Sequence, residues 1–439
     1  MPENTKAAVL SEDGRTYAPH EAVIEASRCL MCEDPPCNTG CPASVDVRRF
    51  IRKIRFGNFR GAVRLIREAN IMVGVCGRVC PQEMLCMEHC TRAQLDTPID
   101  IAGLQRFAGD VELAGLAPVP EPAARRDARV AVIGAGPAGL GAAAELAKAG
   151  VGVTIFEKAN APGGVLTHGI PPFRLDPSFA TDEFSYVERL GVKTKYGVSA
   201  DPATLLADGF VAVFVGIGLG KPYTIGLDGE NLTGVHIAGE LLARVAAGET
   251  PSLGTDVVVI GGGNVAMDAA MTALRLGAAN VHLCSLESHE EMPAFRSEIE
   301  EVQSEGVVFH PRTMPVRILG ENGNVSGYEG IGIRWKTPGV LVPANAEQIP
   351  GTEFGLKADS VIEAIGTGVL DRFDGVETDQ RGVIKVDEDT MQTSMDRVFA
   401  GGDIANGGAT AVLAYGEGKR AAGAIIAMLD RESGKGGGA

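Results

Sequence analysis

The sequence has no apolar run that approaches the ~18 residues of a membrane span. Its first six residues, MPENTK, lack the basic and apolar regions of a secretory signal peptide. Positive charge is also scarce, because 40 Lys and Arg against 56 Asp and Glu give a net charge of −16, which argues against a nucleic-acid-binding surface. These absences predict a soluble, cytoplasmic protein that binds neither membranes nor nucleic acid.

Cysteine is absent between Cys90 and Cys284, and eight of the nine cysteines lie between Cys29 and Cys90. A reducing cytoplasm disfavours disulfides among so many partners, so this region predicts a metal or cluster site. Cys284 ends a predicted buried strand and is interpreted as a core residue. The seven histidines show no metal-ligand spacing and receive no role.

What is present is a globular composition, with 45% hydrophobic and 22% charged residues. At roughly 150 residues per domain, 439 residues predict about three domains. The cysteine-rich region is helical in pattern, as the spacing i, i+3, i+4, i+7 of Val47, Phe50, Ile51 and Ile54 indicates. After a proline-rich stretch, β-branched runs, glycine turns and Ala-rich helices alternate, which is typical of βαβ units. Glycine, 58 of 439 residues, is accordingly enriched.

The first of two such units contains G-x-G-x-x-G between a predicted strand and a predicted helix, with an acid about 20 residues further on. Gly134 permits a tight turn, Gly136 lets a pyrophosphate approach the backbone, and Gly139 lets the helix pack on the strand. The helix N-terminus then faces the pyrophosphate, and Glu157 accepts from a ribose hydroxyl. This pattern predicts a dinucleotide site.

The second unit lies about 127 residues further on and repeats the pattern from Gly261, with Gly263 in the middle and Ala266 in the third position. Residues 285–291, after its second strand, contain no Arg or Lys that would receive a 2′-phosphate. Glu287 in this segment would repel one. The second site therefore favours NAD over NADP.

Two dinucleotide patterns in one chain indicate a flavin–nicotinamide pair, with FAD in the first site and NAD in the second. The sequence here resembles the two-dinucleotide-fold flavoprotein reductases in segments 162–164, 216–218, 364–366 and 398–403. That resemblance implies that Gly402 and Asp403 bind FAD and that a helix from about 409–412 points its N-terminus at the flavin. The expected FAD residues are Gly134, Gly136, Pro137, Ala138, Gly139, Glu157, Gly163, Gly164, Gly402, Asp403, Thr410 and Ala411. The expected NAD residues are Gly261, Gly263, Asn264, Val265, Ala266 and Glu287.

The electrons need an exit, and the cysteine gap removes the dithiol beside the flavin that many such reductases use. The upstream cysteines form two runs with short gaps, each containing a Cys-Pro, which is typical of [4Fe–4S] ligation. A zinc site would favour paired CxxC knuckles, and only Cys29/Cys32 qualifies. Haem attachment needs CxxCH, which the chain lacks in the 86–90 segment.

This arrangement resembles the glutamate synthase small subunit and the flavin part of dihydropyrimidine dehydrogenase, over nearly the whole chain. The resemblance implies two interleaved [4Fe–4S] clusters, the second with a glutamine ligand. Cluster one would take Cys29, Cys32, Cys37 and Cys90. Cluster two would take Cys41, Cys80, Cys86 and Gln105. Cys76 would then be a non-ligand, or the substitute if Gln105 is not one.

The predicted fold class is α/β. An N-terminal α-helical [4Fe–4S] domain precedes two Rossmann-like domains, with the NAD domain inserted in the FAD domain. The expected limits are a helical domain at 1–115, a linker at 116–128, an FAD domain at 129–235 and 360–430, an NAD domain at 236–359 and a disordered tail at 431–439.

The predicted function is an NAD(H)-dependent FAD/iron–sulfur oxidoreductase subunit. It would exchange a hydride with NAD(H) and single electrons with a ferredoxin-like or catalytic partner of a ferredoxin-type complex that oxidises aldehydes or 2-oxoacids. No catalytic side chain is expected, because hydride transfer needs positioning more than proton chemistry. Alternatives are a glutamate synthase small subunit, an NAD-linked dihydropyrimidine dehydrogenase flavin subunit and a non-catalytic scaffold. Eight basic residues are either a solvated helix face or a docking patch: Arg48, Arg49, Arg52, Lys53, Arg55, Arg60, Arg64 and Arg67.

Overall fold

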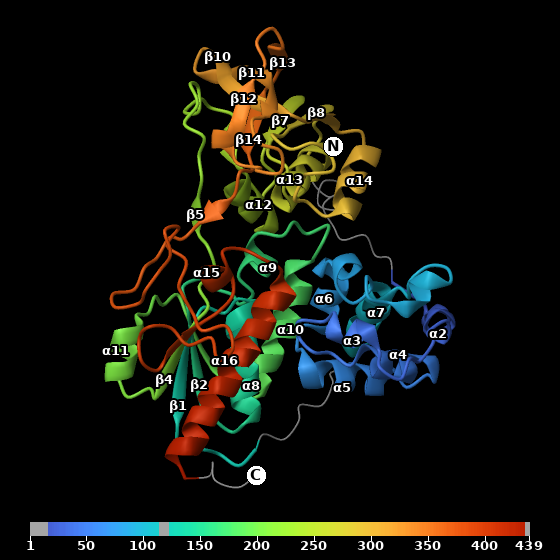
Figure 1. The fold of residues 1–439 in the computed structure, drawn as a ribbon, viewed down its shortest axis with the longest axis vertical. Coiled ribbons are helices and arrows are strands. Elements are labelled where there is room, and N and C mark those ends of the chain that lie inside the picture. The colour runs from blue at the N-terminus through green and yellow to red at the C-terminus, as the bar shows by residue number, and fades with distance from the viewer. Residues whose placement is uncertain (1–15, 114–122, 435–439) are drawn as a thin grey trace. The chain divides into compact units, whose positions relative to one another are not determined.

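The computed structural model describes residues 16–113 and 123–434, which form two compact units (Figure 1). The main unit contains the described parts of Asp13–Thr167, Arg174–Gly220 and Gly368–Ala439. The inserted unit contains, among the described residues, His168–Phe173 and Lys221–Thr367.

The main unit begins with a cysteine-rich helical domain. Helix α4 buries Val47, Phe50, Ile51 and Ile54, which confirms the face expected from their spacing. Its N-terminus is capped by Asp46, whose side chain accepts from the Arg49 amide. The elements of this domain are α2 (Pro19–Ser27), α3 (Pro36–Thr39), α4 (Val47–Arg55), α5 (Phe59–Ala69), α6 (Val73–Val79), η1 (Gln82–Met84), η2 (Thr91–Gln94) and α7 (Ile101–Leu113).

A five-stranded parallel sheet forms the rest of the main unit, in the order β16-β4-β1-β2-β3. Helices α8 and α16 lie side by side against it (Figure 1). They pack closely because Gly141 faces the Tyr415 carbonyl and Gly418 faces the Ala138 carbonyl, where a Cβ would lie 2.6 and 2.0 Å from those oxygens. The elements are β1 (Arg129–Ile133), α8 (Pro137–Lys148), β2 (Gly152–Glu157), α9 (Val165–His168), α10 (Pro177–Arg189), β3 (Lys193–Tyr196), α11 (Pro202–Ala207), β4 (Ala212–Val215), β16 (Val398–Ala400), α15 (Asp403–Asn406) and α16 (Ala411–Glu432).

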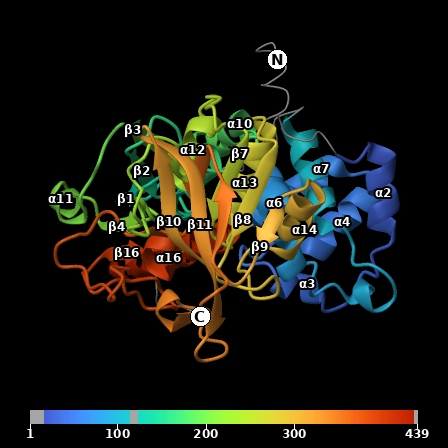
Figure 2. The same cartoon turned by 90° about the horizontal axis from the view of Figure 1, so that it is seen from above.

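The inserted unit has a second five-stranded parallel sheet, in the order β6-β14-β7-β8-β9. One face packs against α12 and α13. An antiparallel sheet formed by β10 to β13 covers the other face, and Figure 2 shows β10 and β11 alongside β7 and β8. Its residues Ile318, Val325 and Tyr328 pack on Val258 and Val361 of the parallel sheet. The elements are β6 (Val235–Ile237), α12 (Ala238–Ala246), β7 (Asp256–Ile260), α13 (Asn264–Arg275), β8 (Asn280–Cys284), α14 (Arg296–Ser304), β9 (Val308–His310), β10 (Thr313–Glu321), β11 (Asn324–Trp335), η3 (Pro343–Asn345), β12 (Ala346–Gln348), β13 (Phe354–Lys357) and β14 (Ser360–Glu363).

These sheets confirm the α/β class expected from the sequence. The inserted unit is longer at both ends than the expected 236–359, because β5 (Lys221–Pro222) pairs with β15 (Thr367–Gly368) where the chain enters and leaves it. The expected tail at 431–439 starts too early, since α16 continues to Glu432. The proline-rich linker and the last five residues of that tail lie mostly or wholly outside the described ranges.

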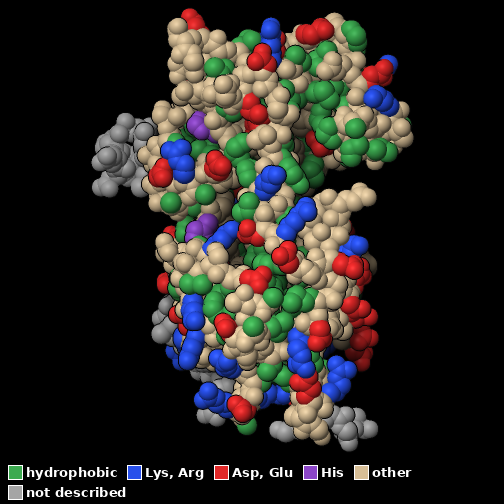
Figure 3. Space-filling view, turned by 90° about the vertical axis from the view of Figure 1, so that its left-hand side faces the viewer, with side chains coloured by type: hydrophobic (Ala, Val, Ile, Leu, Met, Phe, Trp, Pro, Cys, Tyr) green, Lys and Arg blue, Asp and Glu red, His purple; other side chains and the backbone are tan. Residues whose placement is uncertain are grey.

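The surface carries charges of both signs. On the face in Figure 3, acidic and basic side chains are interspersed. None of the helices in the described part of the chain combines the length and apolar character that a membrane crossing requires.

Candidate functional site

The first glycine loop of the main unit is closed tightly on itself. Gly134 has a φ of +98°, and a Cβ there would lie 2.5 Å from the Gly216 carbonyl oxygen. A Cβ at Gly139 would lie 1.9 Å from the Gly134 carbonyl oxygen. A Cβ at Gly164 would come within 3.3 Å of the Gly136 Cα. The structure thus brings together the loop at 134–139, the 162–164 turn and the 216–218 crossover that the sequence singled out. Among the residues that the structure describes, no side chain caps the N-terminus of α8 by a hydrogen bond, and such a helix start suits a pyrophosphate.

Glu157 ends β2 beside this loop and is buried. Its Oε2 accepts from the Ala135 amide at 2.6 Å and its Oε1 from the Ala159 amide at 2.7 Å. The carboxylate therefore has a fixed orientation at the edge where an adenosine ribose would lie in a dinucleotide fold.

The Gly402–Asp403 segment joins the same edge. Gly402 has a φ of +75°, and a Cβ there would lie 3.0 Å from the Ala138 Cβ. Burial raises the pKa of Asp403. Helix α16 then starts at Ala411, where Thr410 caps it by accepting from the Leu413 amide at 3.2 Å, and this agrees with the helix start expected at 409–412.

Glu417 is a residue of this site that sequence analysis missed. It lies buried within α16, and its Oε2 accepts from the Gly402 amide at 2.6 Å and from Asn406 Nδ2 at 3.0 Å. It therefore fixes the loop that precedes Asp403. Nothing in the local sequence distinguishes it from a solvent-facing helical glutamate.

The second glycine loop, in the inserted unit, is less enclosed. Gly261 has a φ of +143°, and a Cβ there would lie 2.3 Å from the Ala364 carbonyl oxygen. Gly263 precedes α13, and a Cβ there would meet nothing within 4 Å. Val265 remains 46% exposed, whereas Ala266 is buried. The Asn264 side chain accepts from the Phe295 amide at 2.8 Å and so orients the segment after β8 against the loop.

Glu287 lies over this second loop, since its Oε2 would be 2.9 Å from a Cβ at Gly262. Burial raises its pKa, and the charge of Glu291 adds to the shift, while that of Arg312 opposes it. The acid that the sequence analysis expected to repel a 2′-phosphate is therefore at the loop. Arg312, a cation that lies 25 residues further along the chain and was missed by sequence analysis, is close to it.

The first cysteine group assembles from three segments. Burial, and then the charges of Cys29, Cys90 and Cys32, raise the pKa of Cys37 to about 12, which indicates that the four side chains lie near one another. The Cys32 Sγ donates to Thr91 Oγ1 at 3.6 Å, next to Cys90 in the chain.

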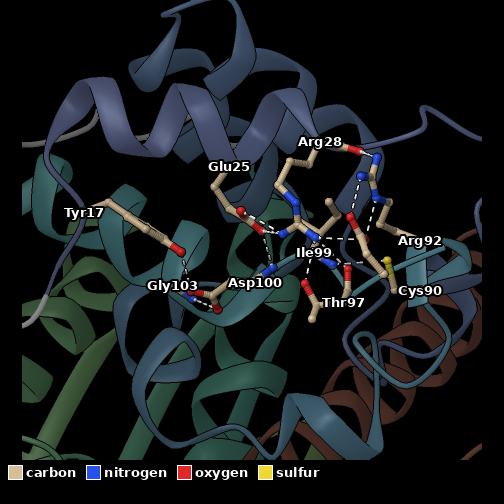
Figure 4. Close-up of polar contacts among 10 residues, drawn as sticks. Tyr17, Glu25, Arg28, Cys90, Arg92, Thr97, Ile99, Asp100 and Gly103 are labelled. Carbon is tan, nitrogen blue, oxygen red and sulfur yellow. Dashed lines mark hydrogen bonds and ion pairs between the residues drawn. The ribbon is translucent and has the colours of Figure 1, made fainter. Parts of the chain in front are cut away.

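A polar network joins Arg28, the residue before Cys29, to the segment that carries Cys90 (Figure 4). Arg28 binds Glu25 at 2.7 Å and the Thr97 carbonyl at 2.7 Å, and the Asp100 amide donates to Glu25 at 2.8 Å. The Ile99 amide donates to Cys90 Sγ at 3.5 Å. α2 is thereby fastened to the segment that follows the second cysteine run.

The second cysteine group is more deeply buried. Burial, and then the charges of Cys76, Cys86 and Cys41, raise the pKa of Cys80. Gln82 links two of these residues, because its Nε2 donates to the Cys76 carbonyl at 3.1 Å and its Oε1 accepts from Cys86 Sγ at 3.4 Å. Cys37 of the first group contributes to the raised pKa of Cys86, so the two groups are neighbours.

Both candidates for the fourth ligand of the second group are buried in the α6–α7 helix pair. Cys76 is buried, and its Sγ accepts from Asn70 Nδ2 at 3.2 Å. Gln105 is buried in α7, and its Nε2 donates to the Val73 carbonyl in α6 at 3.0 Å. That bond leaves Oε1 as the amide atom suited to bind iron. Within the described ranges, no three His, Cys, Asp or Glu side chains converge on a single-ion site.

The cysteine-rich domain is joined to the first Rossmann-like sheet by buried polar contacts. Glu183 of α10 accepts from the Gly74 and Val75 amides at 2.8 and 2.9 Å, and so caps α6, the helix of Cys76. Lys419 of α16 donates to the Ala43 carbonyl at 2.8 Å and to the Ala69 carbonyl at 2.6 Å.

Helix α16 also touches the loop that follows the first cysteine run. A Cβ at Gly416 would lie 2.5 Å from the carbonyl oxygen of Pro42, the neighbour of Cys41. The helix that begins at the first dinucleotide site is therefore in direct contact with a cysteine loop.

Comparisons with known proteins agree with this geometry. Residues 6–115 match the family model for dihydropyrimidine dehydrogenase domain II, 4Fe-4S cluster, and residues 128–418 match that for pyridine nucleotide-disulphide oxidoreductase. The NAD-dependent dihydropyrimidine dehydrogenase subunit PreT of Salmonella typhimurium is 39% identical, with 94% of this chain and 96% of that protein covered. The glutamate synthase [NADPH] small chain of Halomonas elongata is 34% identical, with 98% and 95% covered.

A further relative extends beyond the chain. The NADP(+)-dependent formate dehydrogenase subunit beta of Moorella thermoacetica is 38% identical over 90% of this chain, which spans only 60% of that protein. Among solved structures, FprA of Mycobacterium tuberculosis in complex with NADPH shares the fold at 18% identity and a TM-score of 0.59, with 71% of this chain and 87% of that chain covered.

The two glycine loops and the sheets that carry them define a pyridine nucleotide-disulphide oxidoreductase, and the chain belongs to that family. With its cysteine-rich domain, it is more particularly an NAD(P)H-dependent FAD/iron–sulfur oxidoreductase, of the group of electron-transfer subunits that use FAD, NAD(P) and [4Fe–4S] chemistry.

Proposed function

We propose that the chain is an NADH-linked subunit that relays electrons between the nicotinamide nucleotide and a separate catalytic or iron–sulfur subunit, through two [4Fe–4S] clusters. The observation that carries this proposal is the contact of α16 with the Cys41–Pro42 loop. That contact gives a direct route from the first dinucleotide site to the second cysteine group. The first group would come next along this route. Each of its four cysteines is partly exposed, as an exit to a partner requires.

The residues of the chain serve this relay by binding and positioning. When bound, FAD and the clusters supply the conversion between hydride and single-electron transfer. The 134–139 loop and Glu157 hold the FAD dinucleotide, and the α16 N-terminus at Ala411 favours negative charge on the bound ring system. The 261–266 loop holds NAD(H), with Glu287 on its ribose. No protein side chain needs to transfer a proton in this scheme.

The proposed ligand sets are Cys29, Cys32, Cys37 and Cys90 for cluster one, and Cys41, Cys80, Cys86 and Gln105 for cluster two. Two such clusters predict about eight iron atoms per chain. Cys29→Ser should remove one cluster while NADH still reduces the flavin, because that step lies upstream. Zinc without iron in an elemental analysis would contradict the cluster assignment.

Two variants distinguish Gln105 from Cys76 as the fourth ligand of cluster two. Gln105→Ala should alter only the EPR signal of cluster two, and Cys76→Ser should leave both signals as they are. The reverse pattern would make Cys76 the fourth ligand. The thiols must lose protons that burial holds on them, so cluster assembly should release protons in either case.

A partner is proposed to dock at the surface near the first group. Not all eight basic residues between Arg48 and Arg67 are available to a partner. Arg67 is buried and forms an ion pair with Glu183, and Arg48 donates to the Cys32 carbonyl. Arg52 and Arg60 are exposed, and so are the apolar Leu30 and Leu95 beside the Cys29 and Cys90 segments. Exposed basic and apolar side chains on this domain would suit an acidic iron–sulfur protein.

Charge reversal tests this docking surface. The double variant Arg52→Glu/Lys53→Glu should slow electron delivery to the partner at low salt and leave NADH reduction of artificial dyes unchanged. Salt should slow the wild type more than the variant, because screening acts on the exposed charges. Equal delivery by both proteins at low salt would make this face only a solvated helix surface.

The identity of the partner is proposed as a subunit of a ferredoxin-type oxidoreductase that oxidises an aldehyde, a 2-oxoacid or a similarly small acid. The formate dehydrogenase relative favours this class. The protein would work in the cytoplasm, where reducing conditions keep its free cysteines available as ligands. Mass spectrometry of what co-purifies with the native protein tests this. Recovery of a pyrimidine-reducing subunit or a glutamate synthase large chain would replace it with one of the alternatives.

A further inference from the structure

Arg312 occupies a strained turn beside the second dinucleotide loop. It lies between β9 and β10 with a φ of +56°, in a region that side-chain-bearing residues seldom adopt. Its amide donates to the Glu287 carbonyl at 3.1 Å, and the next amide, of Thr313, donates to the Ser285 carbonyl at 2.8 Å. The turn is therefore fastened to the segment that carries the ribose-binding acid. Local sequence gives no sign of this, because 25 residues separate Arg312 from Glu287.

The Arg312 guanidinium is only partly used. Its Nη2 donates to Glu291 Oε1 at 2.7 Å, and its Cζ lies 5.4 Å from the centroid of the Trp335 ring. Glu291 is itself held in place, because its Oε2 accepts from the Ser288 amide at 3.0 Å and from Trp335 Nε1 at 3.3 Å. The second guanidinium nitrogen, Nη1, is buried and has no hydrogen-bond partner in the described structure.

A buried donor without a partner is destabilising, so it indicates either strain or a missing acceptor. The acceptor that suits a guanidinium best is a phosphate or carboxylate oxygen. The group expected beside Glu287 at this loop is the 2′ position of the adenosine ribose. In NADP that position carries a phosphate, and in NAD it carries a hydroxyl.

We propose that Arg312 is a specificity-determining residue of the nicotinamide nucleotide site. Its guanidinium can donate hydrogen bonds to a 2′-phosphate, but the negative charge of Glu287 prevents a phosphate from binding there. With Glu287 present, the ribose hydroxyls bind the carboxylate and a phosphate is repelled. Without the Glu287 charge, Arg312 binds the phosphate and NADP(H) is accepted. This inference rests on the proposed assignment of the 261–266 loop to NAD(H).

Nucleotide binding measured by calorimetry tests the proposal on the full chain with its cofactors, using NAD+ and NADP+ as probes. Glu287→Gln should raise the affinity for NADP+ about tenfold or more relative to NAD+. Arg312→Met added to Glu287→Gln should remove that gain, and Arg312→Lys should keep part of it, because lysine retains the charge but loses the planar fork. Steady-state kcat/KM with NADH and NADPH should follow the same order.

Arg334→Met is the matched control, because Arg334 is an exposed arginine of the same unit that pairs with Glu347. It should leave the NADP+ to NAD+ affinity ratio unchanged in either background. If Glu287→Gln gains NADP+ affinity and Arg312→Met does not reduce it, Arg312 has no part in specificity and the inference fails.

The failure of the underlying assignment has a different signature. If the single variant Gly263→Trp binds NAD+ as well as the wild type does, the nucleotide lies elsewhere, because an indole there would fill the open side of the loop. That result would overturn the proposed NAD(H) site itself, whichever way the Arg312 variants behave.

Discussion

The buried glutamates of the main unit and Glu363 of the inserted unit are used in opposite ways. In the main unit Glu157 and Glu183 each accept from two backbone amides, and Glu417 accepts from one amide and a side-chain amide. In the inserted unit Glu363 is 1% exposed, and neither of its carboxylate oxygens has a hydrogen-bond partner in the described structure.

The two glycine loops also differ, in how tightly their third position is packed. The loop of the main unit has no room for a Cβ at its third glycine, whereas the inserted unit carries Ala266 at that position. One sequence pattern therefore supports two degrees of closure. Under the proposed assignment, the closed loop would hold FAD, and the more open loop would hold NAD(H), which must bind and leave in each turnover.

Removal of Glu183 tests this comparison with the largest expected effect. Glu183→Ala leaves two buried amides of α6 and the Arg67 guanidinium, 3.7 Å away, without this acceptor, and should cost about 3–5 kcal/mol. Thermal unfolding measures the loss. Stopped-flow kinetics should also show slower cluster reduction while NADH reduces the flavin at the wild-type rate. Glu188→Ala, at an exposed site in α10, is the control and should change neither.

The loop comparison is sharpened by exchanging the third residue of each pattern. Gly139→Ala would force a Cβ to within 1.9 Å of the Gly134 carbonyl oxygen, so it should destabilise the main unit by about 1–3 kcal/mol and lower the bound flavin per chain. Ala266→Gly, in the inserted unit, should cost about 1–2 kcal/mol, through lower helix propensity and the loss of a buried methyl group. Flavin absorbance and thermal unfolding measure both. A full flavin complement in Gly139→Ala would contradict the tight loop.

The smallest effect is expected at Glu363, and with the opposite sign. Burial, and then the charge of Glu230, raise the pKa of Glu363 to about 7. The folded chain then binds more protons than the unfolded chain between about pH 4.5 and 7, so this residue lowers stability as pH rises through that window. Glu363→Gln should raise the unfolding temperature by a few degrees at pH 8 and have less effect at pH 5. A gain that is equal at both pH values would show that ionisation is not its cause.

Much of the fold follows from short-range patterns. The strands at β1, β2, β7 and β8, the helices that follow the two glycine turns and the buried face of α4 lie where the sequence predicted them. Each depends on residues within one element or one turn, where periodicity and glycine geometry act directly. The antiparallel strands β10 to β13 were not anticipated, since their alternation is weak and two bulges interrupt the β10–β11 pair.

The sequence by itself determined the class of chemistry, because glycine loops and clustered cysteines are local signatures of phosphate and iron binding. The tertiary structure alone decided which carboxylate caps which amide and which cation faces which acid. Glu183 accepts from the Gly74 amide, 109 residues away in the sequence. The Arg312 amide, between β9 and β10, donates to the carbonyl of Glu287, which follows β8. Such contacts depend on how whole elements pack against each other, and a single side chain carries no local mark of the partner that packing will bring to it.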